Sequence, residues 1–257
     1  MRYFFTLSYR GTHYCGWQFQ PNGPSVQTIL EEAWRTILRQ PVEVTGCGRT
    51  DAGVHARYYV AHLDAEGEMP PTVLYRLNSL LPDDVAVHSI HPVHADAHAR
   101  FDATERSYAY YLGLRKDPFT TEAAWHFSQH RLLAVEKLQS VADLLPRFSA
   151  FAPFCKTNSG VENYACELRS AHWVYESDQQ QLVFHISANR FLRGMVRLIV
   201  GACLQVGLDQ LTLADVETAL ENQQPLKKNL SVPPQGLFLE NVKYPYPVVG
   251  EMPPPLF

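Results

Sequence analysis

The chain has 257 residues, enough for one large domain or two modest ones, and its composition excludes several classes of protein. Apolar residues make up 46% of the chain and charged residues 19%, which indicates a folded globular protein and excludes a disordered one. The formal net charge of −4 argues against broad, non-specific binding of nucleic acid, although a local basic cleft can still attract an anion.

The sequence predicts neither a membrane segment nor a secretory signal. The best apolar stretch, Met195 to Val206, is interrupted by Arg197 and is shorter than a bilayer requires. The first ten residues lack the apolar length and the cleavage site of a signal peptide, so we expect a cytoplasmic protein without membrane association. The five cysteines are widely spaced without a CxxC pair, which favours free buried thiols over disulfides or a finger-type zinc site.

The first half of the chain mixes strands with helices. Apolar residues recur at helical spacing over 25–40, and Ser25 is a suitable N-cap for that helix. A shorter helix is expected to begin near Pro71 and to stop before Pro82. Strands are predicted for residues 2–11, 42–47, 56–64 and 84–90.

The second half has the same mixture of elements. Helices are predicted for residues 132–145, 191–207 and 213–222. Strands are predicted for residues 106–114, 166–177, 181–189 and 236–244. The two middle strands of this set are expected to form a hairpin. The proline-rich tail, 244–257, is expected to lie extended on the surface.

The order of these elements predicts the fold class. Many strands are adjacent in sequence, which favours an α+β fold with mostly antiparallel sheets over a doubly wound parallel sheet. A break between His94 and Phe101 suggests two α/β subdomains, which we place at residues 1–97 and 98–257.

A glycine-rich stretch, "GCGRTDAGVHA" at residues 46–56, follows a predicted strand. It differs from a dinucleotide fingerprint because its third glycine is misplaced and the next element is a strand instead of a helix. No Walker A pattern occurs in the chain. The sequence therefore predicts no nucleotide cofactor.

Asp51 and Arg49 are the chemically notable residues of this stretch. An arginine within about 4–6 Å keeps a carboxylate ionised, as a nucleophile or general base requires. The alternative is structural, because Asp and Gly are common turn residues and an Arg–Asp pair need not be catalytic. Composition alone favours the structural interpretation.

A series of motifs resembles the tRNA pseudouridine synthase A family. The blocks run in the family's order across nearly the whole chain, which outweighs the structural interpretation of Asp51. They are "YRGTHYCGWQFQPNGPSVQTILEEA", "GRTDAGVHA", "HARFDATERSYAYYL", "SAFAPFCK", "CELRSAHW", "ANRFLRGMVRLIVGACLQVG" and "GLFLENVKY".

This resemblance implies an isomerase with an RNA-binding cleft between its two subdomains. Family members convert uridine to pseudouridine at positions 38, 39 and/or 40 in the tRNA anticodon stem-loop, without a cofactor, and work as homodimers. In the family's pattern many members carry a basic residue after "GWQ", where this chain has Phe19. One contact with the RNA near the N-terminus is therefore expected to be absent or supplied from elsewhere.

The resemblance also implies roles for individual residues. Asp51 occupies the position of the catalytic aspartate, and Arg49 that of the arginine which pairs with it. Tyr108 matches the tyrosine that stacks on the target base, and Leu237 an apolar wall of the pocket. Arg197 matches a basic residue that contacts the aspartate or the substrate.

Chemistry supports these roles without deciding between two mechanisms. Breaking the N1–C1′ bond of uridine requires an ionised Asp51 near the ribose, either to attack the anomeric carbon or to remove a sugar proton. An aromatic ring such as that of Tyr108 can stack on uracil for roughly 1–3 kcal/mol while the base turns. We expect His55 to order the loop through a hydrogen bond and not to transfer a proton, and we also place it among the residues that bind the substrate.

Flipping a stacked uridine costs a few kcal/mol, which contacts with the RNA backbone must offset. Arg190, Arg193 and Arg197 have the spacing of one helical stripe and are predicted to face the substrate. Lys227 and Lys228 are candidates for a peripheral phosphate contact, with an ordinary surface pair as the alternative.

Two other functions compete with this interpretation. The segment "HSIHPVHADAHAR" holds His88, His91, His94, Asp96 and His98, which loosely resembles the HxHxDH of metal-dependent hydrolases. The spacing differs from that motif at two points, so surface histidines are the stronger interpretation and no metal is expected. The third possibility is an RNA-binding module without catalytic activity.

Overall fold

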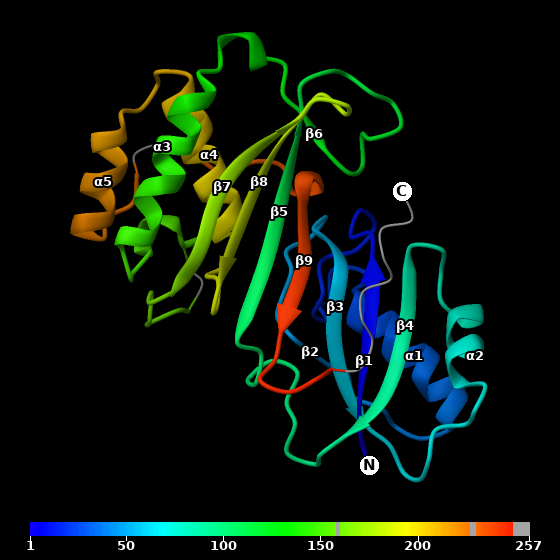
Figure 1. Cartoon of the computed structure of the whole chain (residues 1–257). Coiled ribbons are helices and arrows are strands. Elements are labelled where there is room, and N and C mark those ends of the chain that lie inside the picture. The colour runs from blue at the N-terminus through cyan, green and yellow to red at the C-terminus, as the bar shows by residue number, and fades with distance from the viewer. Residues whose placement is uncertain (158–159, 227–229, 249–257) are drawn as a thin grey trace. The chain divides into compact units, whose positions relative to one another are not determined.

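The computed structural model describes residues 1–157, 160–226 and 230–248, and these form two compact units. Unit 1 contains residues 1–104 and the chain from residue 239 onward, and unit 2 contains residues 105–238 (Figure 1). This division differs from the expected boundary after residue 97 and from a second subdomain that continues to the C-terminus. The difference arises because the last strand, β9 (Leu237–Lys243), lies next to a strand of unit 1.

Unit 1 is built on antiparallel strands in the order β4–β1–β3–β9. β1 (Arg2–Tyr9) pairs with β3 (His55–Asp64) from Arg2 opposite Asp64 to Tyr9 opposite Ala56, and it pairs with β4 (Val85–Val93) along its other edge. Most side chains of the central strand β1 are buried, which explains its nearly continuous apolar sequence. These pairings confirm the strands predicted for residues 2–11, 56–64 and 84–90.

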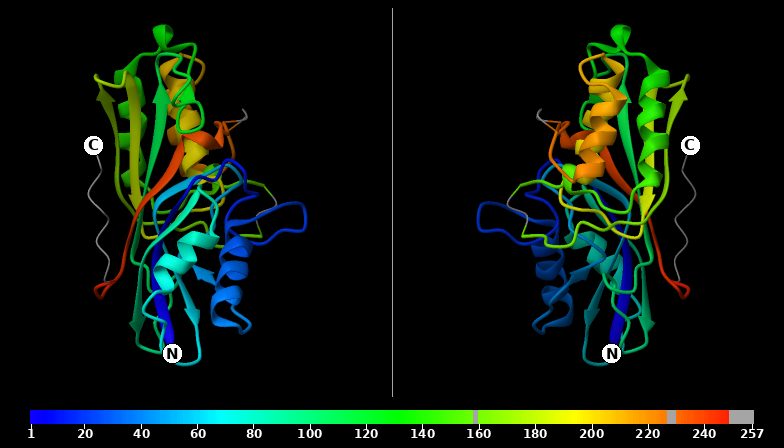
Figure 2. Two further views of the ribbon diagram at one scale, coloured as in Figure 1. Left: turned by 90° about the vertical axis from the view of Figure 1, so that its right-hand side faces the viewer. Right: turned by 90° about the vertical axis from the view of Figure 1, so that its left-hand side faces the viewer.

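Two helices cover one side of the unit 1 strands (Figure 2). α1 (Val26–Leu38) buries Trp34, whose indole ring meets the ring of Phe5 edge to face at 5.5 Å. α2 (Val73–Leu80) contacts both α1 and β4. Ser25 caps α1 as predicted, because its side chain accepts a hydrogen bond from the Thr28 N–H.

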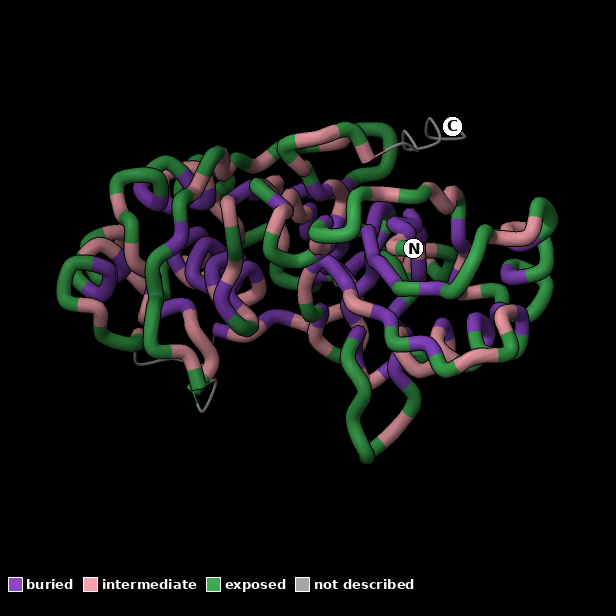
Figure 3. The backbone as a smooth tube through the Cα atoms, turned by 90° about the horizontal axis from the view of Figure 1, so that it is seen from below, coloured by how far each residue is buried: buried purple, intermediate pink, exposed green. Residues whose placement is uncertain are grey.

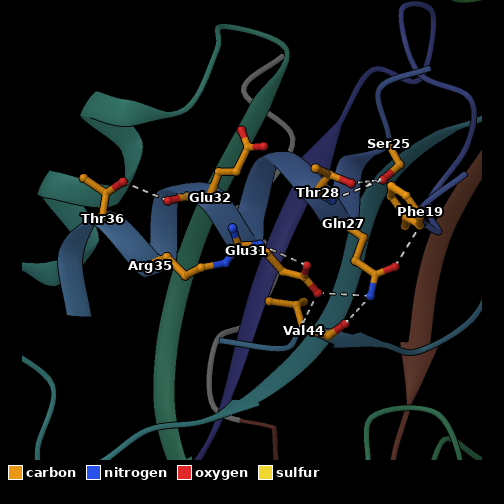
Figure 4. A network of polar contacts seen from close by, with 9 residues as sticks. All are labelled: Phe19, Ser25, Gln27, Thr28, Glu31, Glu32, Arg35, Thr36 and Val44. Carbon is orange, nitrogen blue, oxygen red and sulfur yellow. Dashed lines mark hydrogen bonds and ion pairs between the residues drawn. The ribbon is translucent and has the colours of Figure 1, made fainter. Parts of the chain in front are cut away.

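The strand predicted over 42–47 is reduced to β2 (Thr45–Gly46). Side chains of α1 explain why, because they take the backbone groups that a partner strand would otherwise bind (Figure 4). Glu31 accepts a hydrogen bond from the Val44 N–H at 3.0 Å, and Gln27 donates to the Val44 carbonyl at 3.0 Å. Gln27 also accepts from the N–H of Phe19, whose side chain is 64% exposed.

Unit 2 contains the strand order β5–β8–β7. β5 (Glu105–Gly113) pairs antiparallel with β8 (Gln181–Ala188), and β7 (Leu168–Glu176) forms the predicted hairpin with β8. A two-residue strand, β6 (Trp125–His126), pairs parallel with β5 and was not predicted. Parallel pairing at such a short segment leaves no alternating pattern in the sequence.

Three helices belong to unit 2: α3 (Val135–Leu144), α4 (Met195–Gly207) and α5 (Leu213–Asn222). α4 is buried over most of its length and packs against α3. Buried residues occur in both units (Figure 3). Short 3-10 helices lie at His130–Leu132, Leu145–Arg147, Ala152–Phe154 and Pro234–Gly236.

The structure tests the remaining sequence predictions in part. None of the five cysteines forms a disulfide, and three of them are buried. Within the described ranges, no helix has the length and apolar character to cross a membrane. Lys227, Lys228 and the tail beyond residue 248 lie outside the described residues. The start of the tail packs on unit 1, where the Tyr244 phenol donates to the Ala99 carbonyl at 2.6 Å.

Replacing Ser25 with alanine should lower the free energy of unfolding by about 1 kcal/mol, because the buried first turn of α1 loses its side-chain acceptor. Urea unfolding measures the change. Thr72→Ala is the matched control, since Thr72 occupies the N-cap position of α2 without making a side-chain cap bond. Equal losses in the two variants would contradict the assigned role of Ser25.

Candidate active site

The glycine-rich stretch forms a loop between β2 and β3 that the N-terminal segment holds in place. The Trp17 N–H donates to the Thr50 carbonyl at 3.3 Å, and the Gly53 N–H donates to the Tyr14 carbonyl at 3.4 Å. Gly53 has a φ of 76°, which permits the turn that brings the Val54 N–H to the Asp51 carbonyl at 3.1 Å. Asp51 is therefore half-buried on a loop whose backbone is bound on both sides.

Three aromatic rings form the floor beneath this loop. Trp17 stacks on Tyr59 with ring centroids 4.0 Å apart, and Tyr9 meets the ring of Tyr59 edge to face at 5.6 Å. The Tyr59 hydroxyl donates to the Gly48 carbonyl. A Cβ atom at Gly46 would lie 2.1 Å from the Tyr59 hydroxyl oxygen, so only glycine fits there. Close packing thus explains the glycine at 46, whereas a Cβ atom at Gly48 would meet nothing within 4 Å.

Arg49 does not form the expected pair with Asp51. Its side chain is exposed, and among the residues that the structure describes it makes no ion pair or side-chain hydrogen bond. The direction of each side chain depends on the backbone dihedral angles of the loop, which a spacing of two residues does not reveal. An exposed guanidinium is instead available to an external anion such as a phosphate.

His55 has the loop-ordering role that the sequence suggested. It is 1% exposed, and its Nδ1 atom accepts a hydrogen bond from the Gly11 N–H at 3.0 Å. A Cβ atom at Gly11 would lie 2.0 Å from the Val54 carbonyl oxygen, so the two backbones touch at this point. Such burial does not suit the direct substrate contact that we had also assigned to His55.

Tyr108 lies on β5 in unit 2, opposite Ile186 of β8. Its half-buried ring meets Phe191 edge to face, with ring centroids 5.1 Å apart. Tyr110, two residues further, is fully buried, and burial raises the pKa of its phenol. Of these two tyrosines, Tyr108 therefore retains exposed ring surface for a ligand.

Arg197 and Tyr110 both bind the segment that leads into β9. The Arg197 Nε donates to the Val232 carbonyl at 2.7 Å, and the Tyr110 hydroxyl donates to the Pro233 carbonyl at 2.8 Å. Leu237 follows this segment and is 6% exposed. The half-buried Arg197 is thus fixed to the backbone of the segment that precedes Leu237, the residue predicted as an apolar wall.

The predicted arginine stripe is wrong in its geometry. α4 begins at Met195, after Gly194 with a φ of 71°, so only Arg197 of the three arginines lies on the helix. Arg190 and Arg193 are exposed in the preceding loop. A residue with left-handed backbone at the N-cap prevents the helix from beginning earlier. The apolar spacing continues across this point, so the sequence pattern does not show where the helix begins.

One basic residue near this loop was missed by the sequence analysis. The Lys156 N–H donates to the Arg193 carbonyl at 3.0 Å, and a Cβ atom at Gly194 would lie 2.8 Å from the Lys156 side chain. Lys156 belongs to "SAFAPFCK", one of the stretches that carry the family resemblance. Its place in that stretch could have identified it as a candidate site residue. It adds a third cation to Arg190 and Arg193.

The histidine segment makes several separate contacts instead of one metal site. His88 Nε2 and Ser8 Oγ are 2.8 Å apart, whereas His98 Nδ1 accepts a hydrogen bond from the Arg100 N–H at 3.1 Å. The ring of His94 packs edge to face on Tyr246 at 5.2 Å. Within residues 1–157, 160–226 and 230–248, no three His, Cys, Asp or Glu side chains are placed to hold a metal.

Comparison with known proteins settles the family. The model of the family described as tRNA pseudouridine synthase matches residues 6–102 and 148–245, which include every site residue considered above except Tyr108. The chain belongs to the tRNA pseudouridine synthase family. Members of this family are isomerases, and this chain is therefore an isomerase with an α+β fold.

Several relatives agree with this assignment along nearly their whole length. The chain is 46% identical to tRNA pseudouridine synthase A of Porphyromonas gingivalis, covering 95% of this chain and 97% of that one. It is 46% identical to the enzyme of the same name from Bacteroides fragilis, with 95% and 96% covered. Identity to that of Clostridium acetobutylicum is 33%, with 93% and 98% covered.

Burial of His62 predicts a loss of stability in acid. Burial, aided by the positive charge of Arg2, lowers the pKa of this side chain from 6.5 to about 4, and its Nδ1 accepts from the Ala99 N–H. As the pH falls, His62 is therefore protonated in the unfolded chain before it is protonated in the folded protein. The free energy of unfolding should decrease as the pH falls from 6.5 toward about 4. Urea unfolding across this range should show a shallower decrease for His62→Asn, which keeps an acceptor but does not titrate.

His13→Asn is the control for this prediction, because His13 is exposed. Its pH profile should follow that of the wild type. If the profiles of wild type and His62→Asn are parallel, His62 does not cause the loss.

Proposed function

We propose that the protein converts uridine to pseudouridine at positions 38, 39 and/or 40 of the tRNA anticodon stem-loop. Membership of the family supports the general reaction, the isomerisation of uridine in tRNA. The target positions and the residues below are our assignment. The observation that carries it is Asp51, which the family match includes, on a loop bound by the backbone of residues 14 and 17.

The reaction requires a carboxylate but no redox group. The N1–C1′ bond breaks, the uracil turns, C5 joins C1′, the C5 proton is lost and N1 takes up a proton, so atoms and charge balance within one nucleotide. We assign to Asp51 either attack on C1′ or removal of a sugar proton, and both need the ionised form. No step in this sequence calls for a cofactor.

The detached base must be held while it turns. We assign this task to Tyr108, whose half-buried ring can stack on uracil for roughly 1–3 kcal/mol without fixing its in-plane rotation. Leu237 contributes apolar surface beside it in this proposal. The alternative role for Tyr108, a proton acceptor for C5, is less suitable because a phenol has a reference pKa of about 10.

Basic residues on both units supply contacts with the RNA backbone in this proposal. Arg49, Arg190 and Arg193 are exposed, and Lys156 is half-buried beside Gly194. Charge-assisted contacts to phosphates offset the cost of flipping the target uridine, and they do so locally in a chain of net charge −4.

We also propose that the enzyme acts in the cytoplasm as a homodimer, as the resemblance implies. No observation favours the two competing functions. The histidine segment offers no preformed metal site in the described residues, and an RNA-binding module would not require the close packing around Asp51.

Asp51→Asn should lower conversion by about 1,000-fold or more and leave tRNA affinity nearly unchanged, since the loss lies in the chemical step. Tritium release from tRNA carrying [5-³H]uridine, in the presence of EDTA, measures conversion. Transcripts with a single uridine at position 38, 39 or 40 then identify the target. Asp64→Asn, which removes a carboxylate paired with Arg2 at the far end of β3, should behave as wild type.

Three outcomes of this experiment would count against the proposal. Substantial turnover by Asp51→Asn would remove this residue from its catalytic role. Loss of activity with EDTA would favour the metallohydrolase, and tRNA binding without conversion by the wild type would favour the binding module.

Arg197→Ala should lower kcat/KM by on the order of tenfold or more and weaken tRNA binding, because a partly buried charge-assisted donor is lost. Arg147→Ala is the control, since Arg147 is an exposed arginine of the same unit that pairs with Glu217. Both variants are compared by steady-state kinetics and by filter binding at two salt concentrations. Kinetics of Arg197→Ala equal to those of Arg147→Ala would remove Arg197 from the site.

A further inference from the structure

A buried hydroxyl pair lies directly next to the proposed catalytic residue. Tyr9, the last residue of β1, places its hydroxyl oxygen 2.9 Å from Thr50 Oγ1. Tyr9 is 4% exposed and Thr50 is 8% exposed, so water does not compete effectively for this hydrogen bond. Thr50 immediately precedes Asp51 in the chain.

Thr50 is restrained from a second direction through its backbone. Its carbonyl accepts the Trp17 N–H at 3.3 Å, and Gly16 lies against the same atoms. A Cβ atom at Gly16 would lie 2.5 Å from the Thr50 carbonyl oxygen and 3.2 Å from the carbonyl carbon of Asp51, and Gly16 has a φ of 99°. The backbone of residues 50 and 51 therefore has little freedom to rotate.

The ring of Tyr9 and its hydroxyl have separable tasks. The ring packs near Trp17 and Tyr59, with centroid distances of 6.1 Å and 5.6 Å. A phenylalanine at this position retains that packing and loses the hydroxyl. The hydroxyl can thus be removed without opening a cavity in the core.

We propose that Tyr9 and Thr50 are positioning residues for Asp51. Their hydrogen bond fixes the side chain of Thr50 while Trp17 fixes its carbonyl, and together they set the direction in which the Asp51 carboxylate leaves the loop. Misplacement of a reacting group by about 1 Å can cost on the order of 100-fold in rate. This inference rests on the proposed function, because it requires Asp51 to be the catalytic carboxylate.

The test compares four single variants and the double variant Tyr9→Phe/Thr50→Val in single-turnover conversion of tRNA and in tRNA binding. Tyr9→Phe and Thr50→Val each remove one hydroxyl, whereas Thr50→Ser retains it. Tyr3→Phe is the matched control, because Tyr3 is a buried tyrosine of the same strand whose hydroxyl donates to the Gly67 carbonyl at 3.2 Å. Urea unfolding of every variant shows whether it is folded under the assay conditions.

We expect Tyr9→Phe and Thr50→Val to lower the single-turnover rate by about tenfold or more, with tRNA affinity within about twofold of wild type. The double variant should be no slower than the slower single variant, because either change alone breaks the bond. Thr50→Ser and Tyr3→Phe should retain the wild-type rate. Should Tyr9→Phe fail to fold, the contrast between Thr50→Val and Thr50→Ser decides the matter.

Wild-type rates in both Tyr9→Phe and Thr50→Val would overturn the inference, and so would losses confined to tRNA binding. Independent effects in the double variant would show that the two hydroxyls do not act through each other. If Asp51→Asn is inactive while these variants are fully active, the positioning role fails and the proposed function stands. If the wild type does not convert uridine, both fail together.

Discussion

The proposed active site depends on one close contact, between the backbone of residues 11–17 and the loop that carries Asp51. Gly11 touches the Val54 carbonyl and Gly16 touches the Thr50 carbonyl, with no space for a side chain at either point. The backbone N–H groups of residues 11 and 17 donate hydrogen bonds to the loop and to the strand that follows it. These bonds restrict how the two backbones are oriented relative to each other. A catalytic carboxylate gains from such a frame, because a group held in place needs no reorganisation when the substrate binds. Residues 11–17 reach this position because they follow closely after β1 in the chain.

In unit 2, rigidity is achieved by different means. Arg197 and Tyr110 bind two successive carbonyls, of Val232 and Pro233, and so define the path by which the chain enters β9. A Cβ atom at Gly201 on α4 would lie 1.7 Å from the Leu230 carbonyl oxygen, which shows how tightly this path follows the helix. Arg197 is therefore committed to a structural bond through Nε, which helps to shape the segment before Leu237.

Local patterns in the sequence predicted the local structure well. The N-cap at Ser25, the helical spacing of α1 and the hairpin of β7 and β8 follow from periodicity and turn residues within short windows. The start of α4 was placed too early because Gly194 breaks the register without breaking the apolar pattern. The loop of Asp51 could be located through its motif, but its supports could not. Tyr9 and Thr50 are 41 residues apart, and no pattern in the chain connects them before the strands are paired.

Unit 1 is assembled from the two ends of the chain, with unit 2 inserted between them. β9 lies next to β3, Arg57 of β3 pairs with Glu240 of β9 at 3.3 Å, and the Thr104 N–H donates to the Lys243 carbonyl. During synthesis on the ribosome, β3 emerges early whereas its neighbour emerges after almost all other elements. The N-terminal unit therefore completes its sheet last, because the edge of β3 beyond its short pairing with β2 has no neighbouring strand until β9 is made. Domains otherwise tend to fold in the order of their synthesis. Chaperone dependence of this enzyme is thus expected to arise in unit 1, although that unit is made first.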